Sequence, residues 1–76
     1  MPMLTPLRAR FLQQTGEVKD WDVLVVAVRM PNGCIETIVN HKPNVQYKVR
    51  YYRETYDEQF RLHHNKMIQI VGYMLV

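Results

Sequence analysis

Side chains that could act as nucleophiles or general bases are few in this chain of 76 residues. It contains no serine, which excludes a serine nucleophile. Cys34 and His41 would offer a thiol and a base, but Cys34 directly follows a turn signal and no third group is evident to orient the base. Asp57 and Glu58 are adjacent, so on a helix their carboxylates would point about 100° apart and could not act as a facing pair. The three glycines are too scattered for a phosphate-binding loop. We therefore expect a protein that is not an enzyme.

The residues that could hold a metal ion are His41, His63, His64 and Cys34. Adjacent histidines at the end of a helix point apart, and neither C-x-x-C nor H-x-x-x-H is present. Two histidines that face solvent and the negative end of the helix dipole need no ligand to explain them. The sequence predicts no metal and no other cofactor.

Rings and cations are interleaved in one short segment: Tyr47, Lys48, Arg50, Tyr51 and Arg53. Such rings can stack on bases while the cations contact phosphates, and Arg8 and Arg10 would extend the basic surface. This interpretation predicts a small domain that binds single-stranded nucleic acid or RNA. It is the less favoured interpretation, because three acidic residues on the same outer faces partly cancel the positive field: Glu54, Asp57 and Glu58.

Protein binding explains the same segment more simply. Tyrosine and arginine are enriched at the hot spots of protein interfaces, and neighbouring acids help to select the partner. The predicted partner-binding residues are Tyr47, Arg50, Tyr51, Glu54, Glu58 and Leu62. Exposed single tyrosines are also ordinary on protein surfaces, and this edge, or an uncovered sheet face, would alternatively form a homodimer.

These residues are expected on one long helix, residues 44–65. Its core stripe recurs at spacings of 4, 3, 4 and 4 along the chain: Val45, Val49, Tyr52, Tyr56 and Phe60. Asn44 is a suitable N-cap, and Asn65 suits the left-handed position after the last turn. A strand is the alternative for the first part, because apolar and polar residues alternate over residues 45–51.

Opposite charges four residues apart also favour the helix. The three pairs are Arg50/Glu54, Arg53/Asp57 and Asp57/Arg61. Each such pair stabilises a helix by a few tenths of a kcal/mol.

The remaining elements follow from apolar runs and turn signals. Residues 21–30 read as the central strand, with both faces covered because the run leaves no polar alternation. Pro31-Asn32-Gly33 predicts a hairpin turn, residues 34–39 return antiparallel, and residues 67–76 form the last strand. A short helix begins with Thr5 as cap and Pro6 as first residue, and Leu7 and Phe11 pack inward. An extended N-terminal arm is its alternative.

The predicted fold is a single α+β domain, residues 1–76: a three-stranded sheet made of a β-hairpin and a third strand, with one long helix on a face and a short N-terminal helix. If the last strand pairs beside the first, parallel to one neighbour through a right-handed crossover, the long helix lies on a single side. The opposite face must then be covered by the N-terminal segment, by a second copy or by a partner.

Composition fits a small soluble protein. The apolar content is 47%, and a net charge of +3 is spread without a polybasic tract. Cys34 is the single cysteine, so no intramolecular disulfide can form and a reducing cytoplasm fits. The N-terminus lacks the pattern of a signal peptide, and the longest apolar run, residues 23–28, is far shorter than the roughly 20 residues that span a bilayer.

The run from Tyr51 to Val76, YYRETYDEQFRLHHNKMIQIVGYMLV, resembles the C-terminal half of short uncharacterised proteins of tailed phages. The resemblance covers residues 35–76 and brings no catalytic residue with it. The architecture of hairpin, helix and strand is also similar to that of small phage proteins that inhibit host enzymes by covering a site. It implies a protein that binds and modulates a host or viral protein machine in the cytoplasm of a bacterial host. A structural or assembly subunit of a phage particle is the alternative.

Overall fold

The computed structural model describes residues 3–17 and 19–76. Within these ranges two helices and four strands follow one another in the order α1, β1, β2, α2, β3, β4. Their bounds are Pro6–Gln14 for α1, Val23–Arg29 for β1, Ile35–His41 for β2, Asn44–Thr55 for α2, Arg61–Leu62 for β3 and Asn65–Leu75 for β4. The α+β class is as predicted.

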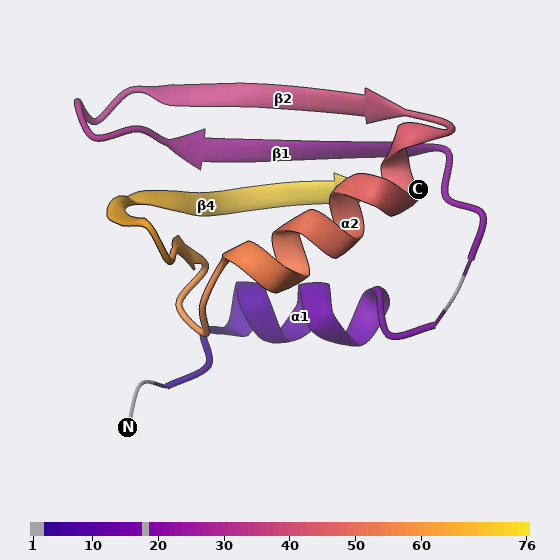
Figure 1. Ribbon diagram of the computed structural model, residues 1–76, viewed down its shortest axis with the longest axis horizontal. Coiled ribbons are helices and arrows are strands. Elements are labelled where there is room, and N and C mark those ends of the chain that lie inside the picture. The colour runs from indigo at the N-terminus through magenta and orange to yellow at the C-terminus, as the bar shows by residue number, and fades with distance from the viewer. Residues whose placement is uncertain (1–2, 18) are drawn as a thin grey trace.

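The strands form one sheet in the order β2-β1-β4-β3, of which Figure 1 shows β2, β1 and β4, and each neighbouring pair is antiparallel. β1 lies between β2 and β4, which confirms it as a central strand. The prediction of three strands is wrong, because residues 61–62, assigned to the helix, pair with β4 as β3. The last strand does lie beside the first, but antiparallel to it rather than parallel to a neighbour.

The turn between β1 and β2 is the one that Pro31-Asn32-Gly33 predicts. Gly33 has a φ of 87°, a left-handed conformation that glycine adopts without the steric cost of a Cβ. The Asn32 side-chain oxygen accepts a hydrogen bond of 3.0 Å from the Cys34 N–H. Local chemistry therefore fixes this hairpin.

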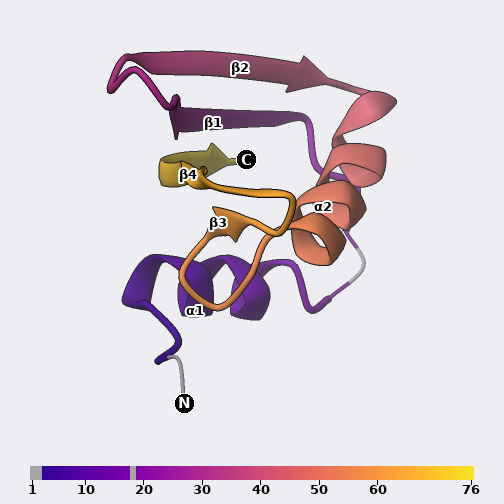
Figure 2. The ribbon, with the colours of Figure 1, turned by 60° about the vertical axis from the view of Figure 1, so that its left-hand side comes forward.

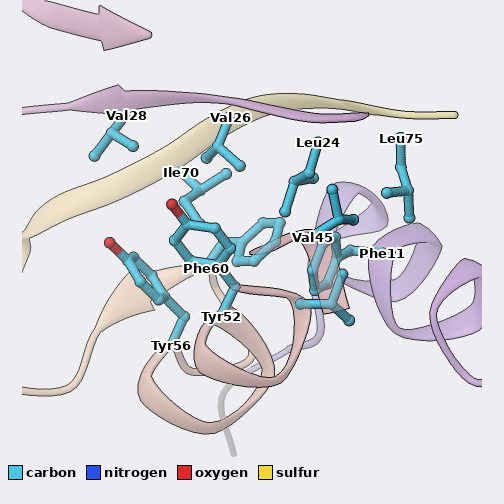
Figure 3. Packing of buried hydrophobic residues seen from close by; sticks show 11 residues of the cluster. Phe11, Leu24, Val26, Val28, Val45, Tyr52, Tyr56, Phe60, Ile70 and Leu75 are labelled. Atoms are coloured by element: carbon cyan, nitrogen blue, oxygen red, sulfur yellow. The ribbon is translucent and has the colours of Figure 1, made fainter. Parts of the chain in front are cut away.

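α2 packs on one face of the sheet, and α1 lies beyond β4 and β3 at the sheet's edge (Figure 2). One core joins both helices to the sheet. Leu24, Val26 and Val28 alternate along β1 and point into this core, each at most 3% exposed. Ile70 and Leu75 from β4 point the same way (Figure 3), toward Phe11 of α1 and the inward side of α2. Every second residue of the strands and every third or fourth residue of the helices therefore point into a single apolar layer.

One buried arginine joins the two helices. The Arg8 side chain is 4% exposed, and its guanidinium donates three hydrogen bonds of 2.8–2.9 Å to carbonyls at the end of α2, those of Tyr52, Arg53 and Tyr56. It also lies 5.0 Å from the centre of the Phe60 ring. A cation is favoured at the negative end of a helix dipole, and it satisfies carbonyls that the last turn leaves free.

α2 ends at Thr55, well before the predicted end at Asn65. Tyr56 is already extended, with φ −112° and ψ 148°. The Asp57 carboxylate then accepts hydrogen bonds of 2.9 Å from the backbone N–H groups of Gln59 and Arg61. Such local side-chain bonds offer the backbone a turn in place of a further helical turn. The prediction of one helix over residues 44–65 is therefore wrong in its second half.

The apolar stripe is buried all the same. Val45, Val49, Tyr52 and Tyr56 are at most 9% exposed, as expected. Phe60 is 1% exposed but enters the core from a turn, with a φ of 60° that is uncommon outside glycine. The 3.6-residue period therefore identified the core residues while hiding the change in backbone conformation.

Several finer predictions about the helices have mixed outcomes. The Thr5 hydroxyl accepts a bond from the Arg8 N–H and Pro6 begins α1, as predicted. Asn44 is not the cap of α2, since Pro43 holds that position without a side-chain bond. Among the described residues the three predicted i,i+4 pairs form no ion pair. The Asp57 carboxylate instead forms an ion pair with the Lys66 ammonium, at 2.7 Å.

The other face of the sheet, here called the outer face, carries no helix in the described ranges. It presents Val23, Val25, Ala27, Ile35, Thr37, Val39, Gly72 and Met74. Ile35, Val39 and Met74 are 52%, 51% and 53% exposed. The prediction that both faces of β1 are covered is therefore wrong, because α1 packs beside α2, where Arg8 and Phe11 are buried.

Candidate interaction surfaces

The outward side of α2 gathers four of the six predicted partner-binding residues around one open hollow. Its volume is about 450 Å³, and it is lined by Pro43, Gln46, Tyr47, Arg50, Tyr51 and Glu54. Tyr47 is 82% exposed and Tyr51 is 42% exposed. We call these lining residues the α2 hollow.

Neighbouring side chains hold the second ring of the hollow in place. The Lys48 ammonium lies 5.0 Å from the centre of the Tyr51 ring. Tyr51 also meets the buried Tyr52 ring edge to face, with 5.3 Å between the ring centres. Tyr47 has no comparable ring contact among the described residues. The hollow thus combines one oriented ring with one that projects freely into solvent.

A second hollow lies on the other flank of the same helix. It has a volume of about 330 Å³ and shares Gln46, Arg50 and Glu54 with the α2 hollow. Trp21 lines its far side, with the Lys19 ammonium 5.5 Å from the ring centre. Arg50 and Glu54 therefore form a charged ridge between two hollows that each contain aromatic rings.

Sequence reasoning missed Trp21 as part of this surface. It assigned Trp21 to the central strand, whereas β1 begins at Val23 and Trp21 lies in the segment before it. No periodicity links position 21 to residues on α2. The Gln46 side chain ties the segment to α2 by donating a 2.8 Å hydrogen bond to the Lys19 carbonyl.

Glu58 and Leu62 do not belong to the α2 hollow. Glu58 lies in the turn after α2, and its backbone carbonyl accepts a 2.9 Å bond from the Thr5 N–H. Leu62 lies on β3 and packs against the core. Both assignments depended on a helix that continues to Asn65, and since α2 ends at Thr55 the structure does not group these two residues with the other four.

The arginines counted toward a nucleic-acid surface are partly used inside the fold. Arg8 is buried under the end of α2. Arg53 reaches the end of α1 and donates bonds to the Leu12 carbonyl, at 3.0 Å, and to the Thr15 hydroxyl, at 2.7 Å. The C-terminal end of each helix therefore accepts hydrogen bonds from an arginine of the other helix. An arginine one position after Leu7 and three before Phe11, inside an apolar stripe, was the available signal for Arg8.

Groups with shifted pKa values have structural explanations. Burial, with the nearby Tyr51 and Tyr52, raises the pKa of Tyr56 to about 12. Burial alone would raise the pKa of Asp57, but hydrogen bonds from Lys66 and from two backbone N–H groups outweigh it and lower that pKa. Hydrogen bonds to Asp22 and Asp20 raise the pKa of Lys42. These shifts belong to the core, to a turn and to an exposed ion pair.

The candidate nucleophile and base lie apart. Cys34 directly precedes β2 and His41 is its last residue, so the two lie about 23 Å apart at the usual rise of a strand. In residues 3–17 and 19–76, no group of three or more His, Cys, Asp or Glu side chains is arranged to hold a metal ion. Neither α1 nor α2, the helices of these ranges, has the length and hydrophobicity needed to cross a membrane.

Comparisons of the chain with protein-family models, with curated proteins and with solved structures give no match.

Proposed function

We propose that this protein is a non-enzymatic interaction module that recognises another protein through the α2 hollow. The observation that carries the proposal is the grouping of Tyr47, Arg50, Tyr51 and Glu54 around one concave surface. Aromatic and arginine side chains in such a setting supply most of the binding energy of many protein interfaces. A tyrosine offers large contact area with few rotatable bonds, so its ordering on binding costs little.

The charges of the ridge support a protein partner over nucleic acid. Arg50 and Glu54 stand one helical turn apart and carry opposite charges, which gives the surface no net attraction for a phosphate backbone. Arg8 is buried, and Arg53, although exposed, donates to a carbonyl and a hydroxyl at the end of α1. The pair of opposite charges suits a partner with a complementary pair at the rim of its own site.

The resemblance to short phage proteins gives the proposal its biological setting. In this setting the chain is phage-encoded, acts in the cytoplasm of a bacterial host and binds a host or viral protein machine in a fixed ratio. An inhibitor of this kind needs no chemistry of its own, since covering a site on the partner is sufficient.

The test is capture of proteins from a bacterial lysate by the immobilised chain, compared with Tyr47→Ala/Tyr51→Ala. Both positions are exposed, so the double variant should remain folded, and we expect capture to fall at least about tenfold with the loss of two anchor rings. Met67→Ala/Met74→Ala is the matched control, because these side chains are 63% and 53% exposed but belong to β4.

Capture that the tyrosine variant retains, or that the methionine variant alone loses, contradicts the α2 hollow as the binding surface. Salt-dependent retention on a nucleic-acid column, lost in the tyrosine variant, would favour the nucleic-acid alternative instead.

A further inference from the structure

β2 is an edge strand whose outer side is open. At its two ends the ladder to β1 is closed by hydrogen bonds from Met30 to Cys34, at 2.8 Å, and from Lys42 to Asp22, at 3.3 Å. Bonded residues alternate along an antiparallel ladder, so the residues between them that bond β1 are Glu36, Ile38 and Asn40. The N–H and C=O groups that point away from the sheet belong to Ile35, Thr37, Val39 and His41. In the described residues no hydrogen bond reaches these groups.

The opposite edge of the sheet is covered. β3 pairs with the first part of β4, and α1 closes the last part, where the Gln14 side chain donates a 3.1 Å bond to the Leu75 carbonyl. The Tyr73 hydroxyl donates to the same side chain at 2.7 Å and holds it in place. β2, by contrast, has no bond to any of its outward backbone groups in the described residues.

β2 also lacks most features that keep edge strands from pairing. Residues 35–41 contain no proline, and their register with β1 is continuous from Ile35 to His41 without a bulge. Such an edge is a ready template for another strand. Its charged residues are Glu36 and, when protonated, His41, so any pairing must accommodate them.

We propose that β2 pairs antiparallel with β2 of a second copy, about a two-fold axis at Ile38, so that the two sheets become one continuous sheet. In this register Thr37 lies opposite the partner's Val39, and Ile35 lies opposite the partner's His41. The outward backbone groups of these residues then bond one another across the axis.

Side chains fit this register. Glu36 lies opposite the partner's Asn40, whose counterpart in this chain has a buried amide nitrogen, Nδ2, without an acceptor. With the Asn40 side chain turned toward the partner, a carboxylate can accept from this amide, twice by symmetry. Ile38, 40% exposed in the single chain, meets its own copy at the axis. No like charges face each other.

The neighbouring register fits less well. With the axis at Thr37, Glu36 would lie opposite Ile38 of the partner subunit and lose water without gaining a donor. Asn40 would lie opposite the partner's Cys34. The charge pattern of β2 therefore selects the axis at Ile38. Because β2 is complementary to itself in this register, a second copy is favoured as the partner over an unrelated peptide. A chain of this size also gains from a second copy, because its own core is small.

Sedimentation velocity over concentrations from about 1 μM to 1 mM tests the dimer. We expect a mass of twice 9.1 kDa at the upper end. Thr37→Pro removes an N–H that bonds only across the axis and leaves the ladder to β1 intact, so it should raise the dimer dissociation constant at least about tenfold. Thr37→Val keeps the N–H and should leave the constant unchanged. Circular dichroism confirms that both variants are folded.

Cysteine cross-linking tests the register in a Cys34→Ser background. Ile38→Cys brings two sulfurs together across a non-bonded pair, where Cα atoms about 4.5 Å apart allow a disulfide, and mild oxidation should cross-link it fully. Thr37→Cys should not cross-link, because its two copies lie two residues out of register.

A monomer at every concentration overturns the proposal, as does a dimer that Thr37→Pro leaves intact. Cross-linking at position 37 but not at 38 overturns the axis at Ile38. Thr37 and Ile38 lie outside the α2 hollow, so these results are independent of the lysate experiment.

Discussion

Arg8 is the side chain on which the packing of the helices most depends. Its guanidinium satisfies three carbonyls at the end of α2 and stacks over Phe60. Burial and the nearby Arg53 lower its pKa, but an arginine stays charged throughout the ordinary pH range. Hydrogen bonds stabilise a buried charge of this kind, and removing the arginine would leave the three carbonyls without a donor.

Arg8→Ala should therefore lower the free energy of unfolding by about 3 kcal/mol, from unsatisfied carbonyls and lost packing. Arg8→Lys should recover part of this loss, because an ammonium can donate to some of the same carbonyls but lacks the planar fork. Arg10→Ala, at an exposed position of the same helix, is the control. Urea denaturation measures all three. A loss for Arg8→Ala no larger than for the control would contradict this role.

Ionisation of Tyr56 lowers the stability of the fold at alkaline pH. Its pKa is about 12 in the fold against an ordinary 10.0, so the native state keeps a proton that the unfolded chain releases. Stability is fully present below pH 10 and is lost as the pH rises from 10 toward 12. The same direction holds for Tyr52, whose pKa burial raises.

Thermal unfolding at a series of pH values measures this effect. The wild type should lose melting temperature steeply above pH 10. Tyr56→Phe, which has no hydroxyl to ionise, should lose less over the same range. Equal slopes for the two proteins would show that Tyr56 does not titrate as described.

The turn between α2 and β3 is the element that decides the topology. Asp57 accepts bonds from Gln59, Arg61 and Lys66, and so turns the chain back toward the sheet. Its apolar neighbours Tyr56 and Phe60 stay buried across the turn. Sequence periodicity could place both in the core but could not separate a helix from a turn, because the turn preserves the spacing of the buried residues.

Asp57→Ala should cost about 2 kcal/mol of stability, because two backbone N–H groups and Lys66 lose their acceptor. Asp57→Asn keeps an oxygen for the turn and should cost less. The lowered pKa of Asp57 means that its contribution is present at neutral pH and is lost as the pH falls below the ordinary 3.8.

Urea denaturation at neutral and acid pH tests both statements. The gap between wild type and Asp57→Ala should shrink as the pH falls below 3.8. A gap that persists unchanged would mean that the charge of Asp57 does not support the turn.

Other elements could be predicted because their signals are local. The cap of α1 at Thr5, the Asn32-Gly33 hairpin and the valine-rich central strand each depend on a few neighbouring residues. Contacts between distant segments left no such signal. The exchange of Arg8 and Arg53 between helices and the place of Trp21 beside α2 arise from the tertiary fold alone.

At the scale of the whole molecule, α2 covers one face of the sheet, α1 lies at the edge beyond β4, and the outer face is left open in the described residues. Partner binding by the α2 hollow uses the covered side, and self-association uses the edge of β2. The sequence could group only those residues of the candidate site that lie on α2. Four residues therefore line one hollow: Tyr47, Arg50, Tyr51 and Glu54. Glu58 and Leu62 lie beyond the end of α2 and are not part of the hollow.

The most direct test of binding through the α2 hollow is an amide NMR spectrum of the ¹⁵N-labelled chain, recorded alone and in bacterial lysate. We expect the signals of Tyr47, Arg50, Tyr51 and Glu54 to lose intensity or shift first, because these residues line the contact surface. Signals of the outer face, such as Val25 and Met74, should change least. An unchanged spectrum, or changes confined to the outer face, would contradict the proposed function.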